Sequence, residues 1–123
     1  MIVGLGIDIV HVNRMRHWLE NPSLMERFFH PAEIEAVRQR GDTAALTLAA
    51  RFAAKEAFGK ALGTGLAGMK LRDIQVVNNH NGKPDMLLFG DALASLHRVG
   101  GRHVHLSLTH ERENAVAVVV IED

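Results

Sequence analysis

The sequence contains no cysteine, which excludes disulfide bonds and thiol catalysis and is consistent with a reducing compartment. It also has no excess charge, because 14 basic residues balance 14 acidic ones, so no overall field attracts nucleic acid or an anionic membrane. No apolar stretch is long enough to cross a bilayer, and the apolar start of the chain lacks the basic leader of a signal peptide. We therefore expect a cytoplasmic protein that binds neither nucleic acid nor membranes.

The length of 123 residues and the 47% share of hydrophobic residues suit one compact domain. No internal repeat and no low-complexity linker divides the chain. We therefore predict a single domain over residues 1–123.

A long central helix is predicted through the stretch Arg51–Gly65, which is rich in alanine and free of proline. Five residues at helical spacing share one stripe: Leu46, Ala50, Ala53, Ala57 and Ala61. Because most of these side chains are small, we expect this helix to pack closely against a sheet. Asp42 or Thr43 should cap its start, and Gly63, followed by Thr64 and Gly65, should end it.

Glu56 and Lys60 lie four residues apart and therefore share one face of this helix. A carboxylate and an ammonium held together can act as a catalytic unit. The alternative is an ordinary solvated ion pair worth about 0.2–0.5 kcal/mol. Spacing alone favours the ordinary pair.

The first strand is predicted over Ile2–Val12, with Ile7 and Ile9 on one face and Asp8 on the other. A carboxylate in so apolar a strand needs a partner, because burying an unpaired charge costs several kcal/mol. The partner can be a metal, a cation or backbone N–H groups, or Asp8 can be satisfied locally at the strand end.

The remaining elements follow from periodicity and turn chemistry. Asn13 should cap a short helix over 14–19, and a second helix should run from Pro31 to near Gly41. Further elements are a strand over 74–77, its hairpin partner over 86–89, a helix over 91–98 and a final hairpin whose strands cover 103–109 and 115–121. The last segment is almost continuously apolar, which indicates a strand buried on both faces.

His103 and His105 lie on one face of the penultimate strand and raise the question of zinc. No cysteine and no third ligand at a diagnostic spacing supports a zinc site. A polar sheet face or a set of donors for an anion is the better interpretation.

Four sequence blocks occur in one order: Gly6-Ile7-Asp8-Ile9-Val10; Arg51-Phe52-Ala53-Ala54-Lys55-Glu56-Ala57 with Lys60-Ala61-Leu62-Gly63-Thr64-Gly65; Asn81-Gly82-Lys83-Pro84; and Ser107-Leu108-Thr109-His110-Glu111. Together they resemble the holo-acyl-carrier-protein synthase family, the short bacterial 4′-phosphopantetheinyl transferases. The resemblance covers almost the whole chain, and its strength lies in the combination of the blocks.

The resemblance implies an α+β fold, with an antiparallel sheet packed against a long central helix, that assembles as a homotrimer with active sites between subunits. It implies transfer of the phosphopantetheine arm of coenzyme A to a serine hydroxyl of apo acyl carrier protein, with release of adenosine 3′,5′-bisphosphate. Such a transferase supports fatty acid biosynthesis.

The site residues are carried over from the same resemblance. Asp8 and Glu56 would hold Mg²⁺ against the pyrophosphate of coenzyme A. Carboxylate and phosphate oxygens suit Mg²⁺, which is a hard cation that prefers oxygen ligands. Glu56, directly or through a metal-bound water, would take the serine proton, and Lys60 would balance charge on the bridging phosphates. Further contacts to coenzyme A would come from Gly63, Thr64, Gly65, Ser107 and His110. Arg51 lies about 140° around the helix from Glu56, so it would reach a phosphate across the subunit boundary or hold the structure.

The carrier protein of this family presents an acidic helix to a basic first helix, a role that matches Arg14 and, by position, Arg27. Solvated arginines on an amphipathic helix are the simpler interpretation. Two positions depart from the family: Ser23 replaces a frequent basic residue, and His30 stands where Ser or Thr usually caps a helix, which should weaken that helix start.

Three other functions stay open. The acceptor can be a carrier domain of a large fatty-acid or polyketide synthase. The chain can be a non-catalytic module that binds coenzyme A, although binding alone does not need Asp8, Glu56 and Lys60 together. It can also be a metal-dependent phosphohydrolase that attacks coenzyme A with water.

Overall fold

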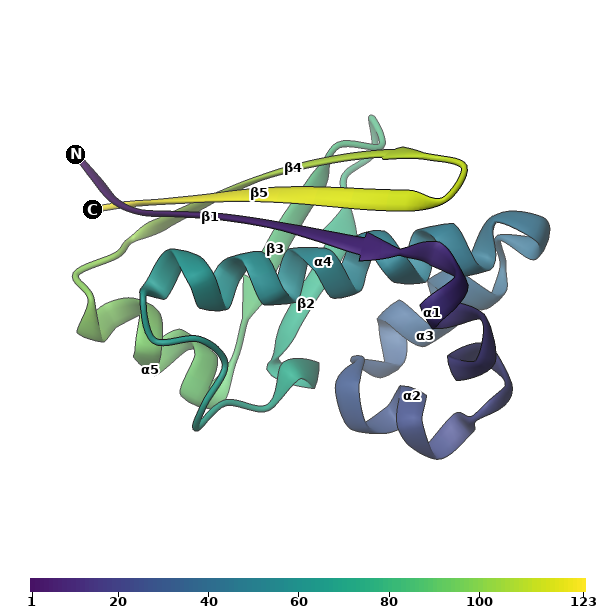
Figure 1. The fold of residues 1–123 in the computed structure, drawn as a ribbon. Coiled ribbons are helices and arrows are strands. Elements are labelled where there is room, and N and C mark those ends of the chain that lie inside the picture. The colour runs from purple at the N-terminus through teal and green to yellow at the C-terminus, as the bar shows by residue number, and fades with distance from the viewer.

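The fold is built around one long helix, α4 (Ala44–Leu62), in the computed structural model of residues 1–123. This helix lies along one face of a three-stranded antiparallel sheet (Figure 1). The strands are ordered β1 (Ile2–His11), β5 (Asn114–Glu122) and β4 (His103–Glu111). Helices cover much of the rest of α4, so most of its side chains are buried. A helix that is apolar on nearly all sides is expected in such a position.

Small residues set the distance between α4 and β1. A Cβ atom added at Gly6 would lie 2.0 Å from the Ala57 carbonyl oxygen, and one added at Gly4 would lie 1.9 Å from the Ala61 carbonyl oxygen. Ala57 and Ala61 belong to the predicted alanine stripe, which is therefore confirmed as the surface that faces the sheet. This close contact places the Asp8 strand directly beside the second half of α4.

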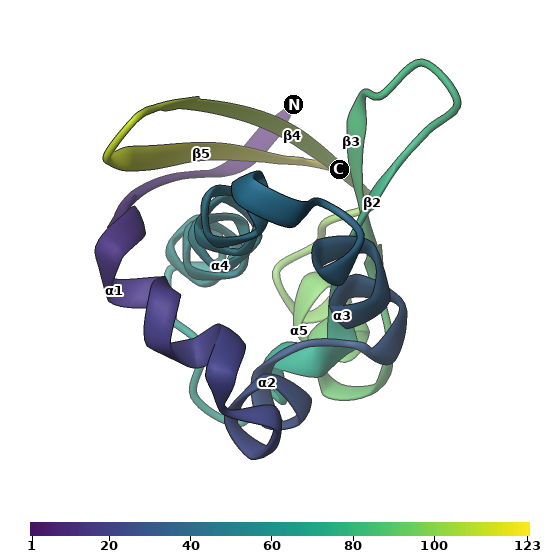
Figure 2. The ribbon, with the colours of Figure 1, turned by 90° about the vertical axis from the view of Figure 1, so that its right-hand side faces the viewer.

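The other elements surround α4 on the sides away from the sheet (Figure 2). Between β1 and α4 the chain forms α1 (Val12–Arg16), the 3-10 turn η1 (His17–Glu20), α2 (Pro22–Phe28), α3 (Pro31–Arg38) and the turn η2 (Gly41–Thr43). After α4 come the turn η3 (Leu71–Asp73), the hairpin of β2 (Ile74–Asn78) with β3 (Pro84–Leu88), and α5 (Gly90–Arg98). The β2–β3 pair is a separate two-stranded sheet whose turn projects beyond the body of the molecule.

The predicted α+β fold, with antiparallel strands against a long central helix, is confirmed. The predicted strands and the helices that start at Pro31, near Ala44 and near Asp91 lie within a few residues of their predicted positions, and Gly63 ends α4 in the left-handed conformation, with a φ of 81°. The helix α2 was not predicted, and the single helix predicted over 14–19 is divided into α1 and η1. None of the helices is both long enough and apolar enough to span a membrane.

Three predictions about helix starts are wrong. Asn13 does not cap α1, because His11, two residues earlier, stands at the N-cap and its ring accepts the Asn13 N–H. Neither Asp42 nor Thr43 caps α4 with its side chain, and the Thr43 hydroxyl instead donates to the Arg40 carbonyl.

His30 is the third correction, since it does not weaken the start of α3. Its ring Nδ1 accepts the Ala32 N–H at 3.1 Å, while the carboxylate of Glu33 accepts the His30 N–H at 3.0 Å. This reciprocal arrangement is a capping box. An unprotonated imidazole nitrogen performs the acceptor role usually filled by a Ser or Thr hydroxyl.

The prediction that the last strand is buried on both faces is also wrong within one chain. Along β5, buried residues alternate with half-exposed ones. The buried set packs toward α4, while Val116, Val118 and Val120 face outward. On the neighbouring strand β1, Leu5, Ile7 and Ile9 are 58–66% exposed. The sheet therefore has one apolar face that nothing in the chain covers; we call these six residues the open sheet face.

Candidate active site

Asp8 finds its partner in Lys60. The ammonium of Lys60 lies 3.0 Å from a carboxylate oxygen of Asp8 and donates a second hydrogen bond to the Ile7 carbonyl at 3.1 Å. The two residues are 52 positions apart in the sequence, and β1 and α4 bring them together. The sequence left a metal, a cation or backbone N–H groups as possible partners of Asp8. In the structure, the partner is a cation, the ammonium of Lys60.

Glu56 lies one turn of α4 before Lys60 and is partly buried. Burial raises the pKa of its carboxyl above the ordinary value, and the nearby negative charge of Asp8 raises it further. The positive charges of Arg14 and Lys60 act in the opposite direction. Four charged side chains from β1, α1 and α4 therefore meet at one place; we call Asp8, Arg14, Glu56 and Lys60 the charged cluster.

Within the charged cluster, the ion pair of Lys60 is made with Asp8. The positive charge of Lys60 acts on Glu56 at longer range. Arg14 is held over the ring of Phe52, with 5.4 Å between its guanidinium carbon and the ring centre. The arrangement therefore brings two carboxylates and two cations together, and the nearby charges act on the pKa of Glu56 in opposite directions.

Arg51 points away from the charged cluster, as its position around α4 predicts. Its side chain is 4% exposed, and its guanidinium donates to the Val76 carbonyl at 2.7 Å. It lines a pocket of about 230 Å³ together with Arg40 and His110. The hairpin β2–β3 forms one wall of this pocket through Val76, Asn78, Gly82 and Pro84. We call it the basic pocket.

The remaining predicted contacts lie in different places. Ser107 is exposed on the outward side of β4, so it is not among the residues of the basic pocket, although His110 is. Gly63, Thr64 and Gly65 form the turn after α4, just beyond Lys60. Two of their backbone N–H groups already donate hydrogen bonds within the chain: the Gly63 N–H donates to the Lys60 carbonyl, and the Gly65 N–H donates to the Gly59 carbonyl.

A sequence model of the 4′-phosphopantetheinyl transferase superfamily matches residues 4–119. The chain belongs to this superfamily. It is 59% identical, over 122 residues and 99% of both chains, to a holo-[acyl-carrier-protein] synthase of Treponema denticola. It superimposes on the crystal structure of a holo-[acyl-carrier-protein] synthase from Neisseria meningitidis with a TM-score of 0.88, at 37% identity and full coverage of both chains.

A second solved structure that resembles the chain contains a bound ligand. The holo-(acyl-carrier-protein) synthase of Bacillus anthracis was solved in complex with CoA (3′,5′-ADP). It matches the present chain with a TM-score of 0.82 and 38% identity, over 98% of this chain and 96% of that one. The family predicted from the four sequence blocks is thereby confirmed.

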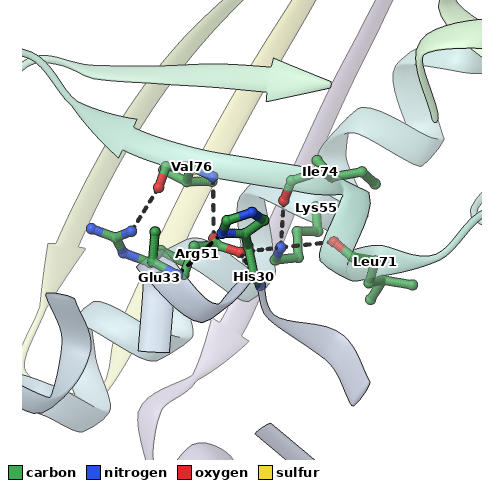
Figure 3. A network of polar contacts seen from close by, with 8 residues as sticks. His30, Glu33, Arg51, Lys55, Leu71, Ile74 and Val76 are labelled. Atoms are coloured by element: carbon green, nitrogen blue, oxygen red, sulfur yellow. Dashed lines mark hydrogen bonds and ion pairs between the residues drawn. The ribbon is translucent and has the colours of Figure 1, made fainter. Parts of the chain in front are cut away.

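Sequence reasoning missed one charged pair of this transferase entirely. Lys55 and Glu33 are both fully buried, and the Lys55 ammonium lies 2.7 Å from the Glu33 carboxylate (Figure 3). Lys55 also donates to the carbonyls of Leu71, at 2.8 Å, and Ile74. Burial lowers the pKa of Lys55 to about 8, and Glu33 opposes this effect. The position of Lys55 within an alanine-rich segment was a signal that this lysine is buried. Its partner Glu33 lies 22 residues earlier and could not be identified from sequence spacing.

The coupling inside the charged cluster can be measured without substrate. In metal-free protein, we expect the pKa of the Glu56 carboxyl to lie above the ordinary value, first because of burial and second because of Asp8. Asp8→Asn removes the second effect and should lower the Glu56 pKa, while Lys60→Met should raise it. Carboxyl carbon shifts of Glu56 recorded by NMR against pH test both signs. A Glu56 pKa that is unchanged in Asp8→Asn would show that the two carboxylates do not share a site.

Proposed function

We propose that the charged cluster is the catalytic centre through which this transferase moves the 4′-phosphopantetheine group of coenzyme A to a serine of apo acyl carrier protein, in support of fatty acid biosynthesis. The observation that carries the proposal is the meeting of Asp8, Glu56 and Lys60 between β1 and α4. The serine oxygen attacks the phosphorus that carries pantetheine. The bond from that phosphorus to the bridging oxygen breaks, and adenosine 3′,5′-bisphosphate leaves with the electron pair.

Glu56 takes the serine proton. A carboxylate whose pKa is raised by burial and by Asp8 is a better proton acceptor than an exposed one. Lys60, fixed by Asp8 and by the Ile7 carbonyl, places a positive charge beside the diphosphate and stabilises the charge that grows on the leaving group.

Asp8 and Glu56 are the residues that would hold Mg²⁺. They fit this ion because both offer hard oxygen ligands. A bound cation would also relieve the repulsion from Asp8, which, after burial, is the second cause of the raised Glu56 pKa. The chain gathers no set of three acidic or histidine ligands, so water and diphosphate oxygens would complete the coordination. When bound, the ion neutralises negative charge on the diphosphate.

Coenzyme A would be bound by two sets of residues on different sides of α4. The basic pocket offers Arg51, His110 and Arg40 to the phosphates, and the turn of Gly63, Thr64 and Gly65 offers exposed backbone and one hydroxyl beside Lys60. Because Arg51 points away from the charged cluster within one chain, a neighbouring subunit would supply the basic pocket. Ser107 would contribute from the outward side of β4, where such a neighbour would lie.

We propose a homotrimer, the assembly that the family resemblance implies. Its structural support is the open sheet face, where three large side chains of β1 and three valines of β5 lie exposed or half-exposed. Sedimentation of the purified chain should give the mass of three copies. Ile7→Lys, which places a charge on the open sheet face, should shift the mass to one copy; an unchanged trimer would exclude this face from the interface. The cytoplasmic location and the single domain over residues 1–123 remain predictions.

Mass spectrometry of the carrier tests the function directly. With coenzyme A, Mg²⁺ and apo acyl carrier protein, we expect the carrier to gain the mass of one phosphopantetheine, and a chelator should abolish the gain. A parallel reaction without carrier should leave coenzyme A intact. Turnover of coenzyme A without carrier would favour the phosphohydrolase alternative, and transfer only to carrier domains of large synthases would redefine the acceptor.

Arg14 and Arg27 are the proposed docking residues for the carrier. Arg27 lies 5.2 Å from the ring of Phe28, and Arg14 lies over the ring of Phe52. Both rings pack against Trp18, so the two arginines lie against one aromatic cluster. We expect Arg27→Glu to raise KM for the carrier about tenfold and to reduce its dependence on salt, with kcat unchanged. Arg14→Glu should change the pH profile as well, because Arg14 also acts on Glu56.

Arg38→Glu is the matched control, since Arg38 is also exposed and lies at the end of α3. It should leave both parameters unchanged. Equal effects of Arg27→Glu and Arg38→Glu on the KM for the carrier would indicate a general charge effect in place of docking.

A further inference from the structure

We infer that Glu33 and Lys55 are positioning residues for the nucleotide of coenzyme A: together they clamp the β2–β3 hairpin to α4 and so fix the wall of the basic pocket. The inference rests on the proposed function, because it assumes that the basic pocket receives a phosphate group of coenzyme A. Neither side chain reaches the pocket itself. Both act through the backbone of β2.

The hairpin is not paired with the main sheet, so contacts other than strand pairing hold it against the rest of the molecule. Its two strands pair only with each other, and an isolated two-stranded sheet is marginally stable in water. Its turn projects away from the rest of the molecule (Figure 2). Yet β2 and the segment after it line the basic pocket through Val76, Asn78, Gly82 and Pro84. The position of this wall therefore depends on how β2 is attached to α4.

Two buried charges make that attachment on one side of β2 (Figure 3). The Glu33 carboxylate accepts the Val76 N–H at 3.1 Å, and the Lys55 ammonium donates to the Ile74 carbonyl. Lys55 and Glu33 are bonded to each other, so α3, α4 and β2 are joined at one point. The contact of Lys55 with the Leu71 carbonyl extends the attachment to η3.

Val76 connects this clamp to the basic pocket. Its N–H is bound by Glu33, and its carbonyl is bound by the guanidinium of Arg51, which lines the pocket. If Glu33 releases Val76, Arg51 loses the fixed acceptor that orients it. The clamp thus controls both the pocket wall and the orientation of a phosphate-binding side chain.

Stability alone does not account for a charge pair at this position. Replacing a buried ion pair by apolar side chains is often neutral or stabilising, because removing two charges from water is costly. That cost is visible in the lowered pKa of Lys55. What an apolar pair cannot supply is directional bonding to the N–H of Val76 and the carbonyl of Ile74.

The test compares Glu33→Gln, Lys55→Met and the double variant Glu33→Gln/Lys55→Met with wild type as the full-length protein. Calorimetry measures the binding of adenosine 3′,5′-bisphosphate, and steady-state kinetics measure KM for coenzyme A and for the carrier, below the melting temperature of each variant. We expect nucleotide affinity to fall at least about tenfold in all three, a size consistent with a positioning error of under about 1 Å. In Glu33→Gln, KM for the carrier should stay unchanged.

Melting temperature separates positioning from stability. Lys55→Met leaves Glu33 buried without its partner, so it should melt below the double variant, which removes both charges. Val37→Ala is the matched control, because Val37 is fully buried on α3 one turn after Glu33 and its apolar side chain forms none of the hydrogen bonds of the clamp. It should lower the melting temperature while nucleotide affinity stays within twofold of wild type.

Nucleotide affinity equal to wild type in Glu33→Gln and in the double variant would overturn the inference. So would an equal loss of affinity in Val37→Ala. If Lys55→Met does not fold, these three variants still decide the question. Absence of nucleotide binding and of transfer in the wild-type protein would instead refute the proposed function, so the two failures are distinguishable.

Discussion

Replacing Glu56 with glutamine is expected to lower kcat for carrier modification by about 10³-fold while the protein stays folded, within the range typical for loss of a general base. Glutamine keeps the size of the side chain but can neither accept the serine proton nor offer a charged ligand to Mg²⁺. Circular dichroism should be unchanged, because Glu56 forms no ion pair that the fold depends on. Single-turnover kinetics with saturating carrier measure the chemical step.

Glu35→Gln is the control for this experiment. It makes the same chemical change at an exposed position of α3, away from the charged cluster, and should leave kcat within twofold of wild type. A Glu56→Gln variant with nearly full activity would remove Glu56 from the mechanism.

Replacing Gly6 with alanine should have the largest effect on stability. Its new methyl group would lie 2.0 Å from the Ala57 carbonyl oxygen and 2.7 Å from the Ala61 nitrogen, both backbone atoms that cannot turn aside. We expect a loss of about 3 kcal/mol in the free energy of unfolding, at the upper end of the cost of overpacking. Urea unfolding monitored by Trp18 fluorescence measures it. Because β1 must move away from α4, the Asp8–Lys60 pair should also be lost.

Gly41→Ala is the matched substitution. Gly41 has a φ of 57°, but no atom lies within 4 Å of an added Cβ. Alanine at this position should therefore lower the free energy of unfolding only by the cost of the left-handed backbone, about 1 kcal/mol. Equal losses in the two variants would show that backbone conformation, and not the approach of β1 to α4, explains the requirement for glycine.

The features that sequence predicted well depend on neighbours along the chain. The alanine stripe, the alternation of His103 to Thr109 and the turn at Gly82 each follow from local periodicity or backbone preference. The charged position of Asp8 in an apolar strand was visible for the same reason, and Glu56 and Lys60 were visible from their spacing of four residues on one helix.

The features that sequence missed depend on contacts between distant segments. From the sequence, Glu33 is expected only to stabilise the start of a helix. The fold shows that its carboxylate also binds the Lys55 ammonium and the Val76 N–H. The prediction for His30 was wrong because the preference of helix starts for Ser and Thr does not take account of the ring nitrogen of His30, which accepts the Ala32 N–H. The apolar run of β5 was read as burial on both faces, yet one of those faces is covered only if another copy of the chain is present.

The central claim is that Asp8 and Glu56 bind one divalent ion together with coenzyme A, and titration calorimetry of Mg²⁺ into the protein saturated with coenzyme A tests it most directly. We predict one ion per chain in wild type and in Glu35→Gln, and no measurable binding in Asp8→Asn or Glu56→Gln. Wild-type magnesium affinity in both of these last two variants would contradict the account.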